Sequence, residues 1–175
     1  MNDESNRSGK DQPAAAPSVP GELVKKVAEG VTDPERAPDL RIALWVEGGA
    51  PSERYEFHFE AAGSGDAKAG VRNEITGRES ESRAIELAPS DFSDLLRTLD
   101  VRRMIRAAGR QPPIPPDSVI GKLEISDGEQ RVSIVFMADP EQAKDVGYEL
   151  PREVANAVDR IYDLAARQLG EDVRP

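Results

Sequence analysis

The sequence predicts an α+β fold, a two-layer sandwich in which two main helices pack on one face of an antiparallel sheet. Apolar and polar residues alternate through 40–46 and 55–61, as in strands that are solvated on one side. Apolar residues near Phe92 and Val154 recur at helical spacing, and 127–128 (Asp-Gly) marks a hairpin between two apolar runs. Strands, helix, hairpin and helix in this order favour helices gathered on one side of the sheet.

Composition excludes several kinds of chemistry. The chain of 175 residues has no cysteine and one histidine, His58, which removes disulfide frameworks and thiolate zinc sites and disfavours a Ser-His-Asp triad. The net charge of −10 works against binding to phosphate backbones and to anionic lipid surfaces. We therefore expect no cofactor, no nucleic acid and no membrane, and we expect another protein as the partner. The sequence leaves the identity of that partner and the oligomeric state open.

No segment of the sequence directs the chain to a membrane. The longest apolar stretches, such as 42–46, are far shorter than the ~20 residues that span a bilayer. The first residues are acidic and lack the apolar core of a secretory signal, so we expect a cytoplasmic protein.

The composition also divides the chain into segments. Residues 1–20 are rich in Ser, Ala and Pro and have almost no large apolar side chain, which predicts a disordered tail. Apolar residues recur at helical spacing within 21–38, a short helix and linker that either docks on the domain or frays, because so short a helix is marginal alone. We expect a single folded α+β domain over 39–170 and a short tail over 171–175.

The sequence marks the expected strands with unequal clarity. In 55–61 one face is aromatic and the other is charged, which is the clearest strand signal in the chain. The stretch 71–81 is weakly patterned, with Val71 and Ile75 among many charged residues. Ile85 and Leu87 suggest a short strand that ends at Pro89.

Capping residues predict the helix boundaries. Ser90 is the expected cap of a helix whose apolar stripe shifts after Leu99, and Asp100 can cap a second segment, so we expect a kink there. Asp139 caps a short helix, and a longer helix is expected over 151–170. The hairpin turn favours two residues in type I′ geometry, which would place Ile125 opposite Gln130.

Three titratable residues share one face of the strand at 55–61. Glu56, His58 and Glu60 alternate, so an imidazole and two carboxylates point the same way. They are weak candidates for a divalent metal site or for general acid catalysis, because no second histidine completes a common metal site. The simpler interpretation is the polar face of a half-exposed strand, with a His58 pKa near ~6.5 that the two carboxylates raise slightly.

A dense basic group follows the predicted kink. It consists of Arg102, Arg103, Arg106 and Arg110. Three of its members recur every four residues along one side of a helix and could bind an anion, a phosphate group or an acidic protein surface. The alternative interpretation is a solvated face that pairs with nearby carboxylates.

Three classes of function follow from these observations. The favoured class is a non-catalytic acidic protein–protein interaction module, such as an inhibitor, an adaptor, an immunity-type protein or an assembly factor, because the sequence contains no catalytic constellation. The second is a small-molecule binding protein with an apolar pocket between sheet and helices, whose candidate lining residues are Trp45, Tyr55, Phe57 and Phe59. The third is an enzyme that uses the histidine of the strand with either neighbouring carboxylate.

Overall fold

The computed structural model describes residues 21–108, 114–170 and 172–175 of the chain. Within these residues six strands form one antiparallel sheet: β1 (Arg41–Gly48), β2 (Tyr55–Ala62), β3 (Ala67–Asn73), β4 (Arg78–Ala84), β5 (Ile120–Ser126) and β6 (Arg131–Met137). The order of the strands across the sheet is β4-β3-β2-β1-β5-β6. The α-helices are α1 (Gly21–Thr32), α2 (Pro89–Thr98), α3 (Val101–Ala108), α4 (Pro140–Asp145) and α5 (Arg152–Leu169), and a 3-10 turn spans Pro34–Arg36.

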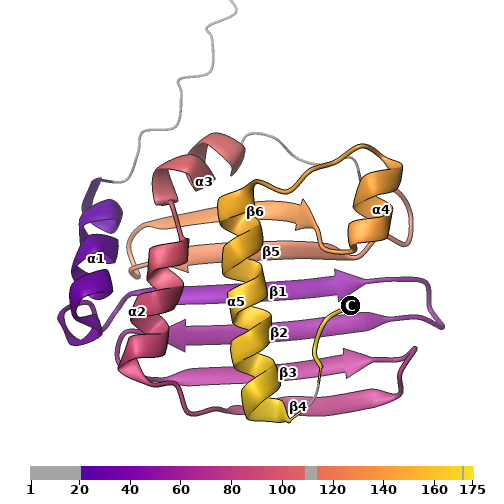
Figure 1. Cartoon of the computed structure of the whole chain (residues 1–175), viewed down its shortest axis with the longest axis horizontal. Helices are drawn as coiled ribbons and strands as arrows, with labels where there is room; N and C mark the ends of the chain where they lie inside the picture. Colours follow the sequence, from indigo (N-terminus) through magenta and orange to yellow (C-terminus); the bar gives the residue numbers. More distant parts are fainter. Residues whose placement is uncertain (1–20, 109–113, 171) are drawn as a thin grey trace, which may run out of the picture.

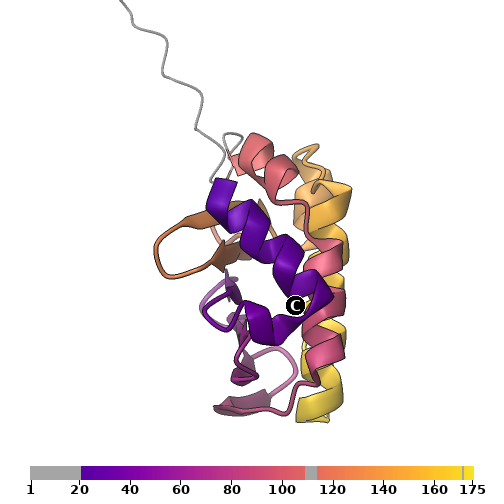
Figure 2. The same cartoon turned by 90° about the vertical axis from the view of Figure 1, so that its left-hand side faces the viewer.

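The helices lie against one face of the sheet, so the chain is the α+β two-layer sandwich that the sequence predicts (Figure 1). Helix α5 crosses the strands near the middle of this face, and α2 runs beside it. Seen from the side, the sheet and the helices form two layers (Figure 2). The opposite face, which we call the outer face, carries none of the described helices.

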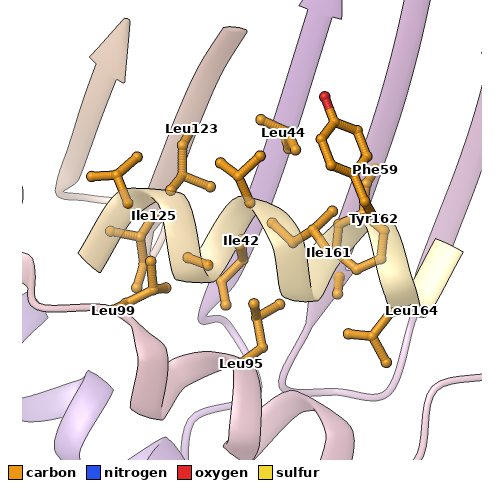
Figure 3. Close-up of a cluster of buried hydrophobic side chains, with 14 of the residues drawn as sticks. Ile42, Leu44, Phe59, Leu95, Leu99, Leu123, Ile125, Ile161, Tyr162 and Leu164 are labelled. Carbon is orange, nitrogen blue, oxygen red and sulfur yellow. The ribbon is translucent and has the colours of Figure 1, made fainter. Parts of the chain in front are cut away.

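The alternation along the strands produces the core. Ile42, Leu44 and Phe59 point toward the helices and are fully buried, while their neighbours in the sequence point to the outer face. These side chains pack beneath α5, which contributes Ile161 and Leu164 from its apolar stripe (Figure 3). Removal of this apolar surface from water stabilises the two layers by roughly 25 cal/mol per Å².

The helix that follows the strands breaks where its apolar stripe shifts. The break at Asp100 separates α2 from α3, and the N–H of Arg103 donates to the Asp100 carboxylate over 3.0 Å, as expected of a cap. Ser90 is not the cap of α2. The helix begins one residue earlier, at Pro89, whose missing N–H is no loss at a first helical position.

Strands β3 and β4 overlap the stretch 71–81, in which the sequence pattern is weak. Strand β4 lies at the edge of the sheet, and most of its side chains are exposed and charged or polar, so it has no apolar face that a periodic pattern could reveal. Charged side chains protect such an edge from pairing with other chains. The strand expected at Ile85 and Leu87 is wrong, because both residues lie in the connection between β4 and α2.

The hairpin of β5 and β6 has the predicted faces but a different register. Ile125 lies opposite Val132 rather than Gln130. The loop is longer than two residues because the Asp127 carboxylate accepts hydrogen bonds from the N–H groups of Glu129 and Gln130, over 3.1 and 2.7 Å. A shift by two residues keeps every side chain on its face, so the apolar pattern could not distinguish the two registers.

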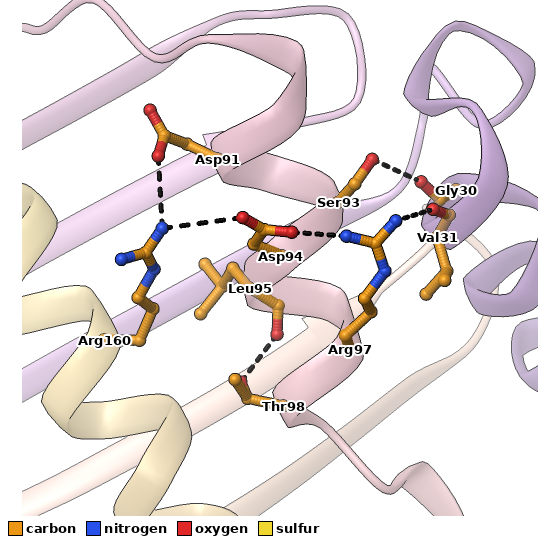
Figure 4. Close-up of polar contacts among 9 residues, drawn as sticks. All are labelled: Gly30, Val31, Asp91, Ser93, Asp94, Leu95, Arg97, Thr98 and Arg160. Atoms are coloured by element: carbon orange, nitrogen blue, oxygen red, sulfur yellow. Dashed lines mark hydrogen bonds and ion pairs between the residues drawn. The ribbon is translucent and has the colours of Figure 1, made fainter.

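Helix α1 docks on the domain, which decides the alternative left open for 21–38. Leu23 is fully buried in the core. The Ser93 hydroxyl of α2 donates to the carbonyl of Gly30 over 3.1 Å, and the Arg97 guanidinium donates to the carbonyl of Val31 over 3.3 Å (Figure 4). The packed structure therefore extends beyond the boundary at 39 that the sequence suggests.

The described C-terminal residues, 172–175, also pack on the domain, although the sequence suggests a tail from 171. Val173 is fully buried, and its carbonyl accepts a hydrogen bond from the Tyr55 hydroxyl. The Arg174 guanidinium pairs with the Asp163 carboxylate of α5 at 2.8 Å. Burial raises the pKa of Tyr55 and of Tyr162, so both phenols stay neutral at physiological pH.

The docking of α1 leads to a first prediction, on the stability of Leu23→Ala. We expect it to lower the free energy of unfolding by roughly 2–4 kcal/mol, because the substitution leaves a cavity under a fully buried side chain. Chemical denaturation measures the change. Lys25→Ala, on the exposed side of the same helix, is the matched control and should change stability by less than about 0.5 kcal/mol. Equal effects of the two substitutions would show that α1 frays in solution.

The turn between β5 and β6 leads to a second prediction. Gly128 has a φ of +90°, a conformation that β-branched side chains tolerate poorly, so Gly128→Val should destabilise the protein by roughly 1–2 kcal/mol. Gly128→Asn should cost less, because asparagine adopts positive φ more readily. Thermal unfolding of both variants measures the difference, and a harmless valine would contradict the turn geometry.

Candidate functional site

A row of four residues crosses the centre of the outer face. Lys122 of β5, Trp45 of β1, His58 of β2 and Gly70 of β3 lie opposite one another in the register of neighbouring strands. The ring centroids of Trp45 and His58 are 5.8 Å apart, and the Lys122 ammonium lies 5.4 Å from the indole centroid. Trp45 is the only tryptophan of the chain and is 37% exposed, so part of its indole is open to solvent on this face.

A groove lies between this row and strand β4. Gly70 faces the outer side of the sheet, and a Cβ atom at this position would approach the backbone of Ser82 to 2.8 Å. The backbone of β4 therefore rises over Gly70, and the pairing of β3 with β4 shifts at the same place, as in a β-bulge. The raised β4 backbone forms one wall and the Trp45–His58 pair forms the other. We call this hollow, of about 360 Å³, the Trp45 groove.

The rim of the Trp45 groove is mostly acidic. Glu56 pairs with Arg54 at 2.6 Å, and Arg72, the one guanidinium of the rim, pairs with Glu74 at 3.0 Å. Three further rim carboxylates form no ion pair with any described residue: Glu47, Glu79 and Glu81. Because Glu56 and Arg72 are each already paired, the three carboxylates without an ion pair among the described residues give the groove a negative potential that water screens only partly.

A second hollow of about 370 Å³ lies on the same face toward the opposite ends of these strands. Its cationic side chains are Arg41, Lys68 and Arg83, and Glu60 is one of its carboxylates. Burial opposes ionisation of Glu60, but Lys68 at 3.0 Å and Arg41 at 3.1 Å outweigh that effect and lower its pKa. The outer face thus carries charges of opposite sign at the two ends of its hollowed region.

The metal or acid–base site considered for Glu56, His58 and Glu60 is not assembled. Each carboxylate is held by a cation, and the His58 imidazole lies 3.9 Å from Glu60. Among the described residues no three His, Asp or Glu side chains converge as a metal site requires. Partial burial and the charge of Lys68 lower the His58 pKa, and Glu60 offsets them only in part, so the upward shift expected from the sequence has the wrong sign.

The arginine group lies in the helix layer, away from the outer face. Arg102, Arg103 and Arg106 are exposed on α3, and Arg110 lies outside the described residues. Arg103 pairs with Asp100 at 3.3 Å, which is the local pairing expected of a solvated helix face. Arg102 and Arg106 are exposed and form no ion pair with any described residue.

The proposed apolar pocket does not form from its candidate residues. Tyr55, Phe57 and Phe59 are buried beneath the helices, whereas Trp45 lies on the other side of the sheet. Alternation along β1 separates them, since Trp45 lies between the inward-facing Leu44 and Val46. A different apolar hollow, of about 450 Å³, lies between β6, α4 and α5, and its lining includes Met137, Tyr148 and Leu150.

The Trp45 groove was missed in the sequence for a physical reason. The alternation in 40–46 separates Trp45 from Leu44 and Val46 but does not show what lies beside it, and the weakly patterned stretch 71–81 gives no clear strand signal next to Gly70. An isolated glycine inside a strand is the one local signal of a bulge or a close backbone approach.

Scans of the chain against known protein families and against characterised proteins find no match. None of the described helices is both long and apolar enough to cross a membrane.

The environment of His58 leads to a third prediction. Its NMR titration midpoint should lie below the ~6.5 of a free imidazole, because burial and Lys68 disfavour the charged ring. The unfolded chain then binds this proton more tightly than the folded chain does. The contribution of His58 to stability is therefore complete above pH ~6.5 and declines as the pH falls through the folded pKa.

A matched pair of substitutions tests the cause of the shift. Lys68→Gln should raise the midpoint of His58, since it removes a like charge from the vicinity of the ring. Lys144→Gln, exposed on α4, should leave the midpoint unchanged. A midpoint at or above that of the unfolded chain would contradict the burial of His58 against Trp45.

Proposed function

We propose that the protein is a non-catalytic interaction module that binds another protein through the outer face of its sheet. The observation that carries the proposal is Trp45, a half-exposed indole at the centre of a face that no described helix covers, beside a preformed groove. Tryptophan is among the residues that contribute most to binding when a partner removes it from water. An inhibitor, an adaptor, an immunity-type protein and an assembly factor all act by such contacts.

The surroundings of His58 support a binding role over an enzymatic one. Its imidazole packs against the indole, and Lys68 and Arg41 already engage the neighbouring Glu60. A general base needs an acceptor nitrogen directed at substrate and a partner that orients the ring. Here the ring is instead one wall of a groove. The acidic composition favours a protein over a nucleic acid, and the lack of cysteine is compatible with a reducing, cytoplasmic setting.

The apolar hollow between β6, α4 and α5 favours a second candidate function, the binding of a small apolar molecule. Its volume of about 450 Å³ suits such a ligand, and Tyr148 and Leu150 provide apolar lining. Native mass spectrometry of the purified protein should then find a retained small molecule, and Ala155→Trp, which fills the hollow, should abolish retention. If neither the unsubstituted protein nor the Ala155→Trp variant retains a small molecule, this candidate function is excluded.

A fourth prediction separates the outer face from the arginine group as the binding surface. Partners are captured on the immobilised protein from the lysate of its own organism and identified by mass spectrometry. Trp45→Ser should weaken the affinity of the specific partner at least tenfold, about 1.4 kcal/mol. The double variant Arg102→Ser, Arg106→Ser, in the helix layer, should bind normally. Normal binding by Trp45→Ser together with weaker binding by the double arginine variant would instead place the binding surface on α3. Circular dichroism should confirm that each variant is folded.

A further inference from the structure

We propose that the Trp45 groove receives a single basic side chain, arginine or lysine, from an extended segment of the protein partner. This inference rests on the proposed function and deepens it, because it names the chemistry that the outer face recognises. The shape of the groove, its aromatic wall and the charge of its rim each support it.

The walls of the groove suit a long, narrow side chain. The raised backbone of β4 at Ser82 lies over Gly70 on one side, and the Trp45–His58 pair stands on the other. The volume of about 360 Å³ exceeds what one side chain needs, so the backbone on either side of it can also lie in the groove.

The aromatic wall favours a cation. A guanidinium or ammonium group within about 6 Å of an indole centroid is attracted by the negative face of the ring. Lys122 already occupies such a position at 5.4 Å on the β5 side of Trp45. His58, on the β2 side, adds a second ring at which a planar guanidinium can stack, and it adds no positive charge when neutral.

The rim supplies complementary charge without forming a metal site. Glu47, Glu79 and Glu81 have no ion pair with any described residue, so a basic side chain would find carboxylates that are free to pair. These carboxylates come from β1 and β4 on opposite sides of the groove, and no three acidic or histidine side chains of the described residues converge on one point. A side chain that spans several ångströms matches that spacing, whereas a bare metal ion does not.

The neighbouring hollow limits the number of basic residues in the partner segment. Its cations, Arg41, Lys68 and Arg83, outnumber its carboxylates, Glu60 and Asp66. A uniformly basic peptide would therefore meet repulsion beyond the Trp45 groove. A single basic residue flanked by neutral or acidic residues fits both hollows.

The experiment uses Trp45 itself as the reporter, since its fluorescence is the only indole signal of the full chain. The probes are the peptide acetyl-Gly-Ser-Arg-Ser-Gly-amide and the same peptide with citrulline, a neutral isostere, or with glutamate in place of arginine. We expect the arginine peptide to change the fluorescence with a dissociation constant at least tenfold below that of the citrulline peptide. The glutamate peptide should bind more weakly still, and added salt should weaken only the arginine peptide.

Variants of exposed side chains locate the effect in the groove. The double variant Glu79→Gln, Glu81→Gln should weaken the arginine peptide at least threefold and leave the citrulline peptide unchanged. The control Glu129→Gln, Glu149→Gln removes the same charge from exposed positions far from the groove and should have no effect. Equal affinity for the arginine and citrulline peptides, or no response at about 10 mM, would overturn the inference.

These outcomes separate the inference from the proposed function. If Trp45→Ser abolishes capture of the partner while the peptides show no preference for arginine, the outer face binds protein. In that case the inference that the groove receives a basic side chain is wrong. If the arginine peptide binds in the groove and Trp45→Ser leaves partner capture intact, the groove has the proposed chemistry and the proposed partner surface is wrong.

Discussion

The packing of α5 against the inner face of the sheet is the interaction on which the rest of the structure depends. Ala157, Ile161 and Ala165 recur four residues apart along α5 and are fully buried. Ile161 lies in the cluster of buried side chains together with Ile42 of β1 and Leu95 of α2 (Figure 3). Because the strands alternate, this one contact decides which side chains become core and leaves the other face of the sheet to water.

The two edges of the sheet are protected in different ways, and this directs attention to the outer face. Strand β4 carries exposed charges along its length, whereas α3, whose Met104 and Ile105 are buried, packs against β6. We therefore do not expect a strand of another chain to pair with either edge of the sheet. The bulge of β4 also raises its backbone over Gly70. The bulge therefore forms one wall of the Trp45 groove in addition to shaping the edge of the sheet.

Much of the fold was predictable, because its signals are local. Period-two alternation in 55–61, the shift of stripe at Asp100 and the capping signal at Asp139 all depend on residues within a few positions of each other, and the structure contains these elements. Strand β4 was not predictable in the same way, since an edge strand without an apolar face carries no period. The hairpin register was also undetermined, because a two-residue slip leaves the hydrophobic pattern unchanged.

The sequence by itself determined the class of the fold, the polar nature of the face that holds Glu56, His58 and Glu60, and the lack of a cysteine or multi-histidine site. The alternation in 40–46 separated Trp45 from the inward-facing Leu44 and Val46, but it could not show which residues of other strands lie beside Trp45. Only the tertiary structure decided that Lys122, His58 and Gly70 stand in one row with Trp45, and that α1 docks through Leu23. The physical reason is that strand pairing and helix docking join residues far apart in the chain, and their energies depend on surfaces that exist only after folding.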